Sequence, residues 1–414
     1  MIEGGTVLDG SGAPPVPGEV ICRGDEIIAV GSGSATAGPE GSAGFHEREL
    51  DSATRVDATG CTVMPGLIDA HCHLTFDEPR SNDELFFHRD HTLAALATAH
   101  HLPKLLMAGV TSVADPDTIF RMGPAIRDAV EAGWIEGPRI TTGVAALLTA
   151  VGGTAGRLIP DEGEVGYAEV VRTTDEMVLA TRRQIKEGAD FVKIHATGSI
   201  PTRSGELQVW TRQRQGGVRH STRPGQKPVA AHCRNASLHA RRRSRRGGIP
   251  STTPASWTRR ALEAAVESGA DSSPVFTFLS NLWHLRTRGG AGTRTWRMSS
   301  GGDRRNCRDG QAGPRRRGPV CSGSESGRSS LPLRALACDA GGRVVRRTPR
   351  PGVRLRRIRC ATANNAHAVH ADELGVLSVG RRADVLVVQG DVASTCPCWE
   401  TAGTCVRCCH AECR

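Results

Sequence analysis

Strand-like and helix-like segments alternate between Val63 and His195, and this alternation constrains the fold more than any other feature of the sequence. Apolar residues recur at helical spacing in three segments, residues 91–108, 121–132 and 173–188. Three short apolar runs between them have the pattern of buried strands, residues 109–115, 139–143 and 190–195. Repeated β/α units of this kind predict a parallel sheet or a barrel.

The two ends of the chain have a different pattern. Residues 1–64 consist of short strand-like runs and turns, including a predicted hairpin over residues 18–31 with a turn at Gly24-Asp25. Near the other end, residues 380–388 combine a turn with a strongly apolar run. Both ends are therefore expected to supply β-structure outside the repeated β/α units.

The strongest local signal is the segment Pro65–His73, Pro-Gly-Leu-Ile-Asp-Ala-His-Cys-His, an apolar strand that ends in His-x-His. Side chains alternate along a strand, so His71 and His73 are predicted to point to the same side at its carboxyl end. Two imidazoles on one face suit a divalent metal such as zinc. Barrel enzymes place their sites at the carboxyl ends of their strands.

The segment from Val63 to His73 resembles the first barrel strand of the amidohydrolase superfamily, in particular its imidazolonepropionase-like and Xaa-Pro dipeptidase-like members. Residues 109–115 and 190–198 resemble the second and fourth strands of that family. The resemblance implies an α/β fold, a (β/α)8 TIM-type barrel with a small β-sandwich built from both termini. Residues 1–64 and 374–393 would form the sandwich, and residues 65–373 the barrel.

The resemblance also implies further site residues. Lys193 stands where such proteins carry a carboxylated lysine that bridges two metals, and His232 ends the expected fifth strand. Glu325 occupies the place of an acid after the eighth strand, which binds metal and takes a proton from water. His195 lies two residues beyond Lys193 and is a candidate substrate contact. A surface lysine, a core histidine and an ordinary strand-end residue are the competing interpretations of Lys193, His232 and His195.

The charge of the chain changes sharply after Trp210. The residues up to Trp210 carry 16 basic and 30 acidic side chains, a net charge of −14, whereas the rest carry 37 and 13, a net charge of +24. Four Arg-rich stretches in the second part have no periodicity, residues 211–225, 238–259, 284–317 and 328–357. The expected sixth-strand histidine is missing from 238–259. We therefore hypothesise that these stretches are frame-shifted translations of a GC-rich gene.

Cysteine is also concentrated at one end. Six of the 14 cysteines lie in residues 396–414, and a Cys-x-x-Cys pair begins at Cys405. Their irregular spacing argues against a zinc knuckle. The tail 394–414 is predicted to be disordered, and the chain is not expected to be a disulfide scaffold.

The resemblance implies hydrolysis of carbon–nitrogen bonds in cyclic amides, amidines or short peptides, with one or two divalent metals, zinc being the expected one. A small molecule or dipeptide is the expected substrate. Two alternatives remain, a non-catalytic barrel remnant and a basic nucleic-acid-binding protein that uses the +24 part of the chain. The second needs an ordered basic face, and the Arg-rich run 241–246 has no helix or strand pattern. Specific nucleic-acid binding is therefore not expected, and homo-oligomerisation is left open.

Neither a membrane span nor a secretion signal is expected. No stretch approaches 18 uninterrupted apolar residues, and the first residues lack the basic and apolar regions of a signal peptide. These features favour the cytoplasm.

Overall fold

The computed structural model describes ten segments of the chain, residues 1–31, 53–76, 84, 88–149, 166–195, 229–232, 250–252, 273–274, 351–393 and 406–409. Only the backbone is described for residues 149, 229–232, 250–252, 273–274, 351–354 and 406–409. Within these segments, no helix combines the length and apolarity needed to cross a membrane.

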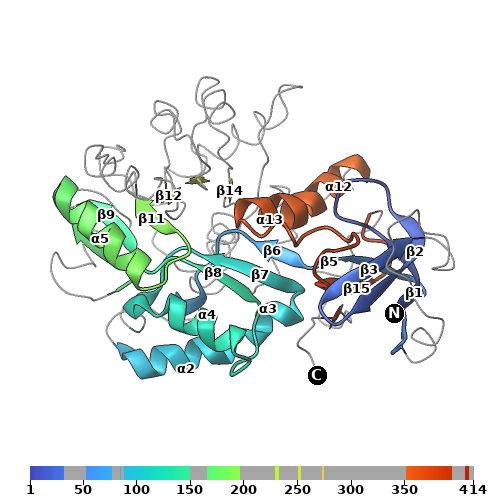
Figure 1. Ribbon diagram of the computed structural model, residues 1–414, viewed down its shortest axis with the longest axis horizontal. Helices are drawn as coiled ribbons and strands as arrows, with labels where there is room; N and C mark the ends of the chain where they lie inside the picture. Colours follow the sequence, from blue (N-terminus) through green and yellow to red (C-terminus); the bar gives the residue numbers. More distant parts are fainter. Residues whose placement is uncertain are drawn as a thin grey trace, which may run out of the picture.

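Strands from both ends of the chain form one mixed sheet (Figure 1). Its members are β1 (Ile2–Val7), β2 (Val16–Arg23), β3 (Glu26–Gly31), β4 (Val56–Asp57), β5 (Cys61–Pro65), β15 (Val385–Gln389) and β16 (Val406–Cys409). The order is β16-β15-β5-β1-β2-β3, with β4 beside β1. β15 runs antiparallel to β5, and the Thr62 hydroxyl donates to the Gly390 carbonyl (2.7 Å) across 328 positions of sequence. Residues remote in sequence thus share this sheet.

Two parallel sheets hold the repeated β/α units. One has the order β6-β7-β8, formed by Leu67–Asp69, Val110–Asp115 and Arg139–Thr142. The other has the order β10-β9-β11-β12-β13-β14, formed by Ala168–Val171, Ala146–Thr149, Val192–His195, Val229–His232, Pro250–Thr252 and Ser273–Pro274. Every pairing within these two sheets is parallel. The carboxyl ends of neighbouring strands therefore meet at a common edge.

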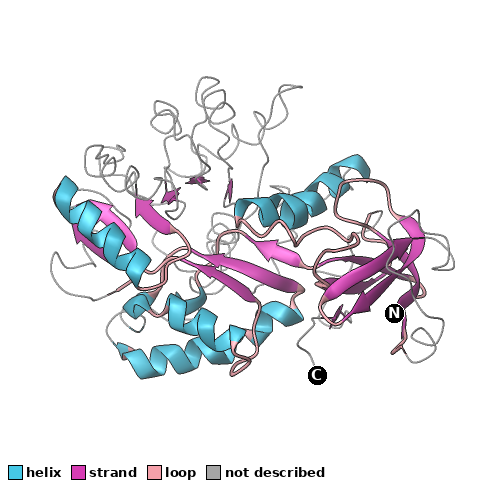
Figure 2. Cartoon of the chain, in the orientation of Figure 1, coloured by secondary structure: helices cyan, strands magenta, loops and turns pink. Residues whose placement is uncertain are grey.

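Helices pack on the parallel strands, α3 on β7, α4 on β8, α5 on β10 and β11, and α13 on β6 (Figure 2). The helices are α2 (His91–His101), α3 (Pro103–Met107), α4 (Gly123–Glu131), α5 (Thr174–Lys186), α12 (Pro351–Arg359) and α13 (Asn365–Ala368). Shorter turns are η1 (Leu74–Phe76), η3 (Ile119–Arg121) and the π-helical η5 (Cys360–Asn364).

Side-chain caps fix where the two longest helices begin. The Asp90 carboxylate accepts from Leu93 N–H (2.8 Å) at the start of α2. The Thr173 hydroxyl accepts from Glu176 N–H (3.1 Å) at the start of α5, and Glu176 in turn accepts from Arg172 N–H (2.5 Å). Such caps satisfy backbone donors that have no partner within the helix.

The apolar core is divided among several clusters of buried side chains. The largest lies between the helices α2, α3 and α4 and the parallel strands, and it extends to the terminal sheet through Met64 and Leu386. A second joins β6 to α13 through Ile68, Ala114 and Ala366, and the Asn365 side chain donates to the Ile68 carbonyl. A third lies within the terminal sheet and includes Ile27 and Val385. The strand β6, which precedes the His-x-His motif, is thus held by the C-terminal part of the chain as well as by its neighbour β7.

Most of the local predictions are confirmed. The hairpin over 18–31 corresponds to β2 and β3, and the helix expected over 173–188 corresponds to α5. The helix expected over 91–108 is interrupted at Leu102, before Pro103, because proline cannot continue the hydrogen bonding of the preceding turn. The strands β9 and β10 were not expected. Residues 406–409 of the tail predicted to be disordered form a strand, and the rest of that tail lies outside the described residues.

Gly66, between β5 and β6, is tightly enclosed. A Cβ at this position would overlap the Thr111 side chain on β7. Gly66→Ala is therefore expected to lower the free energy of unfolding by about 1–3 kcal/mol, the usual cost of overpacking a core. Denaturant unfolding would measure the change. Gly31→Ala is the matched control, because a Cβ at Gly31 meets nothing within 4 Å. Equal losses in the two variants would contradict the prediction.

Candidate metal centre

The backbone brings the predicted site residues to the carboxyl ends of parallel strands. His71 and His73 follow β6, whereas Lys193 and His195 belong to β11. All four side chains are buried, with exposed fractions between 1% and 5%. Buried polar side chains at this depth need partners.

The two histidines lie against each other and against Phe76. The ring centroids of His71 and His73 are 5.3 Å apart, and the ring planes are almost perpendicular, at 84°. His73 stacks on Phe76, with 4.7 Å between centroids and 9° between planes. The His73 ring is therefore confined on one face by an aromatic side chain that follows it by one helical turn.

Asp117, two residues beyond the end of β7, was not among the predicted site residues. Its carboxylate oxygen lies 3.1 Å from His73 Nδ1, and the Asp117 side chain is 1% exposed. Burial acts to raise the pKa of Asp117, but the charge of His73, the hydrogen bond from His73 and the charges of Lys193 and His195 lower it to about 2. The influence of these three side chains on one carboxylate shows that residues from β6, β7 and β11 converge on one region.

Lys193 lies near two acids of opposite behaviour. Its side chain is 1% exposed, and its charge acts on both Asp115, the last residue of β7, and Asp117. Burial raises the pKa of Asp115 well above its ordinary value and the nearby Asp117 raises it further, whereas backbone hydrogen bonds from Leu74 and Asp117 and the charge of Lys193 lower it. An uncompensated buried ammonium is costly, and the charge of Asp117, whose pKa is lowered, offsets this cost.

Cys72 lies between the two histidines in sequence and is 1% exposed. Burial raises the pKa of the Cys72 thiol well above its ordinary value, and the carboxylates of Asp69 and Asp115 raise it further. The thiolate is the form that binds metals and attacks carbonyls. Cys72 therefore fits a packing role within the strand end better than a chemical one.

An aromatic connection links the histidine pair to β11. Phe76 makes an edge contact with Tyr167 at 5.3 Å and 73°, and Tyr167 lies 6.4 Å from the His195 ring. Tyr167 is the only tyrosine of the chain and is 1% exposed. Asp115 could have been identified from its place at a strand end. Asp117, Phe76 and Tyr167 carry no local sequence signal of this kind.

Two of the predicted ligands, His232 and Glu325, have side chains outside the described part of the structure. His232 ends β12, where its backbone is in register with His195, but its side chain lies outside the description. Glu325 lies outside the described residues altogether. The next strand, β13, sets Ser251 beside His232. The expected sixth-strand ligand position is thus occupied by residues without an imidazole.

The donor set fits a divalent metal in its chemistry. Two imidazoles on one strand end, a buried lysine and two buried carboxylates are ligand types and neighbours that zinc sites use. Among the described side chains, no three His, Cys, Asp or Glu residues form a group that could hold an ion by themselves. Further ligands would have to come from beyond these side chains, and His232 and Glu325 are the candidates.

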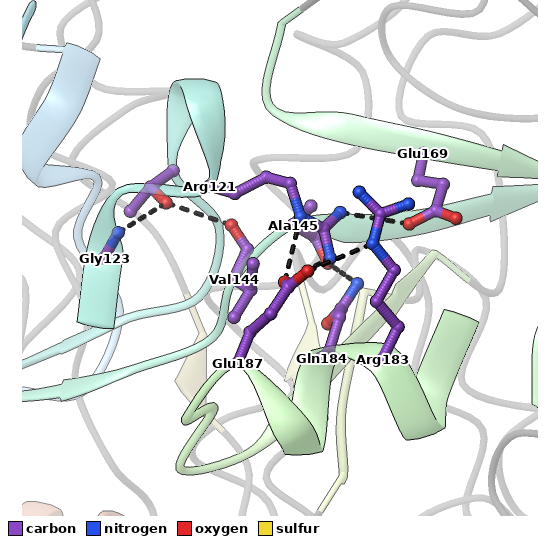
Figure 3. A network of polar contacts seen from close by, with 9 residues as sticks. Arg121, Gly123, Val144, Ala145, Glu169, Arg183, Gln184 and Glu187 are labelled. Atoms are coloured by element: carbon purple, nitrogen blue, oxygen red, sulfur yellow. Dashed lines mark hydrogen bonds and ion pairs between the residues drawn. The ribbon is translucent and has the colours of Figure 1, made fainter. Parts of the chain in front are cut away.

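The segment that carries Asp117 continues into a strained turn. Phe120 and Arg121 adopt left-handed backbone angles, with φ of 54° and 58°. Arg121 forms ion pairs with Glu187 (2.5 Å) and Glu169 (3.1 Å), and Arg183 also reaches Glu187 (3.0 Å; Figure 3). A left-handed residue other than glycine costs roughly 1–2 kcal/mol. The ion pairs offset this cost and tie the segment to β10 and the end of α5.

Arg121→Ala removes these ion pairs while it keeps the backbone strain. We expect the free energy of unfolding to fall by about 1–2 kcal/mol. Arg121→Gly should lose less, because glycine adopts positive φ without steric cost. Denaturant unfolding of the three proteins would give the order wild type, Arg121→Gly, Arg121→Ala. A glycine variant that is less stable than the alanine variant would contradict the assignment of strain.

Fold and site together define a class, namely α/β proteins whose polar site residues follow the carboxyl ends of parallel strands. The sequence matches the family described as the Amidohydrolase family over residues 62–268, half of the chain. The chain belongs to the amidohydrolase family.

Curated relatives match only parts of the chain. It is 37% identical over 73 residues to a D-aminoacylase of Alcaligenes xylosoxydans xylosoxydans, covering 18% of this chain and 12% of that protein. It is 26% identical over 219 residues to the ochratoxinase of Aspergillus niger, covering 49% and 43%. The match thus spans less than half the length of these relatives.

Solved structures match over a much longer span. A Xaa-Pro dipeptidase with methionine bound in its active site has a TM-score of 0.76 at 20% identity, covering 95% of this chain and 96% of the other. The A. niger ochratoxinase has a TM-score of 0.73 at 21% identity, covering 95% and 91%. At this identity the likeness concerns the fold, and it implies a TIM-type barrel.

Proposed function

We propose that this chain is a metal-dependent hydrolase that cleaves carbon–nitrogen bonds in cyclic amides, amidines or short peptides. The observation that carries the proposal is the buried convergence of His71, His73 and Lys193 with Asp117 at the carboxyl ends of parallel strands. Membership of the amidohydrolase family supports it, as do relatives named as a D-aminoacylase, an ochratoxinase and a Xaa-Pro dipeptidase.

In this proposal, His71, His73 and a carboxylated Lys193 would hold one or two divalent ions, zinc being the expected metal, with His232 and Glu325 as further ligands. A bound divalent ion supplies a Lewis acid that activates water and polarises the scissile carbonyl. Glu325 takes the proton from the water and passes it to the leaving nitrogen. His195, in β11 beyond Lys193, contacts the substrate. The buried aromatic side chains of Phe76 and Tyr167 exclude bulk water from the histidine pair.

The finer architecture is also a proposal. Residues 65–373 close into a (β/α)8 barrel, and the sheet built from both termini is part of a β-sandwich of residues 1–64 and 374–393. The chain acts on a small molecule or dipeptide in the cytoplasm. The regular parallel order β11-β12-β13-β14 supports a barrel wall that continues past residue 195.

Chelation would test the function. The full chain is purified, its metal content is measured, and hydrolysis of N-acyl amino acids and Xaa-Pro dipeptides is assayed before and after dialysis against a chelator. We expect bound metal, loss of hydrolysis on chelation and recovery on addition of Zn²⁺. Hydrolysis that survives complete removal of the metal would contradict the metal-dependent mechanism. A folded chain that neither retains metal nor hydrolyses these substrates would favour the non-catalytic remnant.

We also propose that the Arg-rich stretches after residue 210 are frame-shifted. Support comes from Pro250–Thr252, which pairs with β12 at the place of a sixth strand yet sets Ser251 beside His232. Reading the nucleotide sequence of residues 238–259 in the other two frames is the test. A strand that ends in histidine in one of these frames is the expected result. Its absence from both would refute the frame-shift proposal.

A further inference from the structure

We propose that Asp117 is a positioning residue that fixes the imidazole of His73 so that its Nε2 faces the metal. The inference rests on the proposed metal-dependent function. It is carried by the 3.1 Å contact between His73 Nδ1 and the Asp117 carboxylate, in which the two side chains are 5% and 1% exposed.

The contacts of the His73 ring leave it little freedom. Phe76 stacks on one face at 9°, and His71 approaches with its ring nearly perpendicular at 84°. Stacking fixes the plane of the ring but does not distinguish its two nitrogens. The carboxylate does, because it can only accept a hydrogen bond and so selects the tautomer that carries its proton on Nδ1. Nε2 then keeps the lone pair that a metal needs.

Asp117 is itself held in place from two sides. The next residue, Thr118, is fixed by two hydrogen bonds. Its N–H and its hydroxyl both donate to the Val144 carbonyl, at 3.2 and 2.9 Å. The Thr118 hydroxyl oxygen also accepts from Gly123 N–H at 3.0 Å. Figure 3 draws this bond at the labelled Gly123, next to the hydroxyl's bond to the labelled Val144. Ile119 N–H donates to the Thr75 hydroxyl at 3.1 Å, which joins this segment to the turn after His73. The acceptor is thus rigidly placed relative to the ring.

One other acceptor lies near Nδ1, the backbone carbonyl of Asp117 itself, at 3.5 Å. The carboxylate is closer and charged, and charge-assisted hydrogen bonds are about twice as strong as neutral ones. A direct metal-binding role for Asp117 is the main competing interpretation. The two roles predict different results when the carboxylate is replaced by an amide of the same shape.

The test compares Asp117→Asn and Asp117→Leu with wild type in the full-length, metal-stripped protein. Zn²⁺ affinity is measured by competition with a chromophoric chelator, and the His73 tautomer by ¹⁵N NMR at a pH where imidazoles are neutral. The asparagine side-chain oxygen can still accept from Nδ1, whereas leucine cannot. We expect the number of bound Zn²⁺ ions to stay unchanged in Asp117→Asn, with a modest loss of affinity, and a 10- to 100-fold loss in Asp117→Leu.

The controls separate positioning from general damage. Asp384→Asn changes a buried aspartate that pairs with Arg139 at 3.2 Å, remote from the histidines, and should leave Zn²⁺ affinity and the His73 tautomer unchanged. The double variant His71→Ala/His73→Ala should lose bound metal. In wild type the Nδ1–H tautomer is expected, and in Asp117→Leu a mixture.

Several outcomes would overturn the inference. The inference would be wrong if Asp117→Leu bound Zn²⁺ within twofold of the wild-type affinity. It would also be wrong if Asp117→Asn lost one Zn²⁺ ion completely, because Asp117 would then be a metal ligand. The wild-type protein could bind no Zn²⁺ and still show the Nδ1–H tautomer of His73, with that tautomer lost in Asp117→Leu. This result would refute the metal-dependent function but support the positioning of His73 by Asp117. A wild-type His73 protonated on Nε2 would refute the positioning.

Discussion

Alanine at both His71 and His73 is expected to remove bound metal and to lower kcat/KM about a thousandfold. Both imidazoles are buried at the end of β6 with their rings 5.3 Å apart, so one substitution leaves the other donor in place and the pair must be changed together. Loss of a metal that activates water costs several kcal/mol of transition-state stabilisation, and each 1.36 kcal/mol corresponds to about a tenfold change in rate.

Metal content per chain and hydrolysis of an amide substrate would be measured together on the double variant. His100→Ala is the matched control, because His100 lies exposed on α2 and should leave both quantities unchanged. A double variant that keeps its full metal content would show that the histidine pair is not the anchor of the site.

Lys193→Met is expected to lower the free energy of unfolding of the metal-free protein by about 3–5 kcal/mol. The substitution keeps the length and much of the volume of the side chain but removes the cation that balances Asp117 in the interior. Removal of one partner of a buried charge pair leaves the other uncompensated, which accounts for the size of the effect.

Denaturant unfolding would again provide the measurement. Lys186→Met, at the exposed end of α5, is the control and should change stability by less than about 0.5 kcal/mol. If the two methionine variants were equally stable, Lys193 could not be the charge that balances Asp117. A double variant, Lys193→Met with Asp117→Asn, that is more stable than Lys193→Met alone would directly support the charge balance between Lys193 and Asp117.

Periodicity in the sequence predicts the elements whose apolar spacing and turn residues are local to the segment. The hairpin of β2 and β3, the helix α5 and the strand β11 follow from apolar spacing and turn residues. The strands β9 and β10 were missed. β9 begins only a few residues after β8 with no helix between them, which departs from the repeated β/α pattern.

Site residues too can be predicted where the local sequence pattern places them, and not where contacts between remote segments do. His71, His73 and Lys193 follow from strand patterns and from the resemblance to a family, since each stands at or near a strand end. Asp117 and Tyr167 depend on contacts between segments remote in sequence, 44 residues apart for His73 and Asp117. Apolar spacing along the chain carries no information about such contacts. The roles of His232, Glu325 and His195 stay predictions.

The pairing of β15 with β5 has a consequence for the order in which the protein can assemble. The strand that leads into the histidine pair is synthesised early, yet its neighbour β15 and the Asp384 carbonyl that accepts from Gly66 N–H (2.8 Å) belong to the last tenth of the chain. Contacts between residues so far apart form slowly because a large loop must close first. A nascent chain therefore exposes one edge of β5 until residue 389 has left the ribosome, and a stop codon before Val385 would leave that edge permanently unpaired.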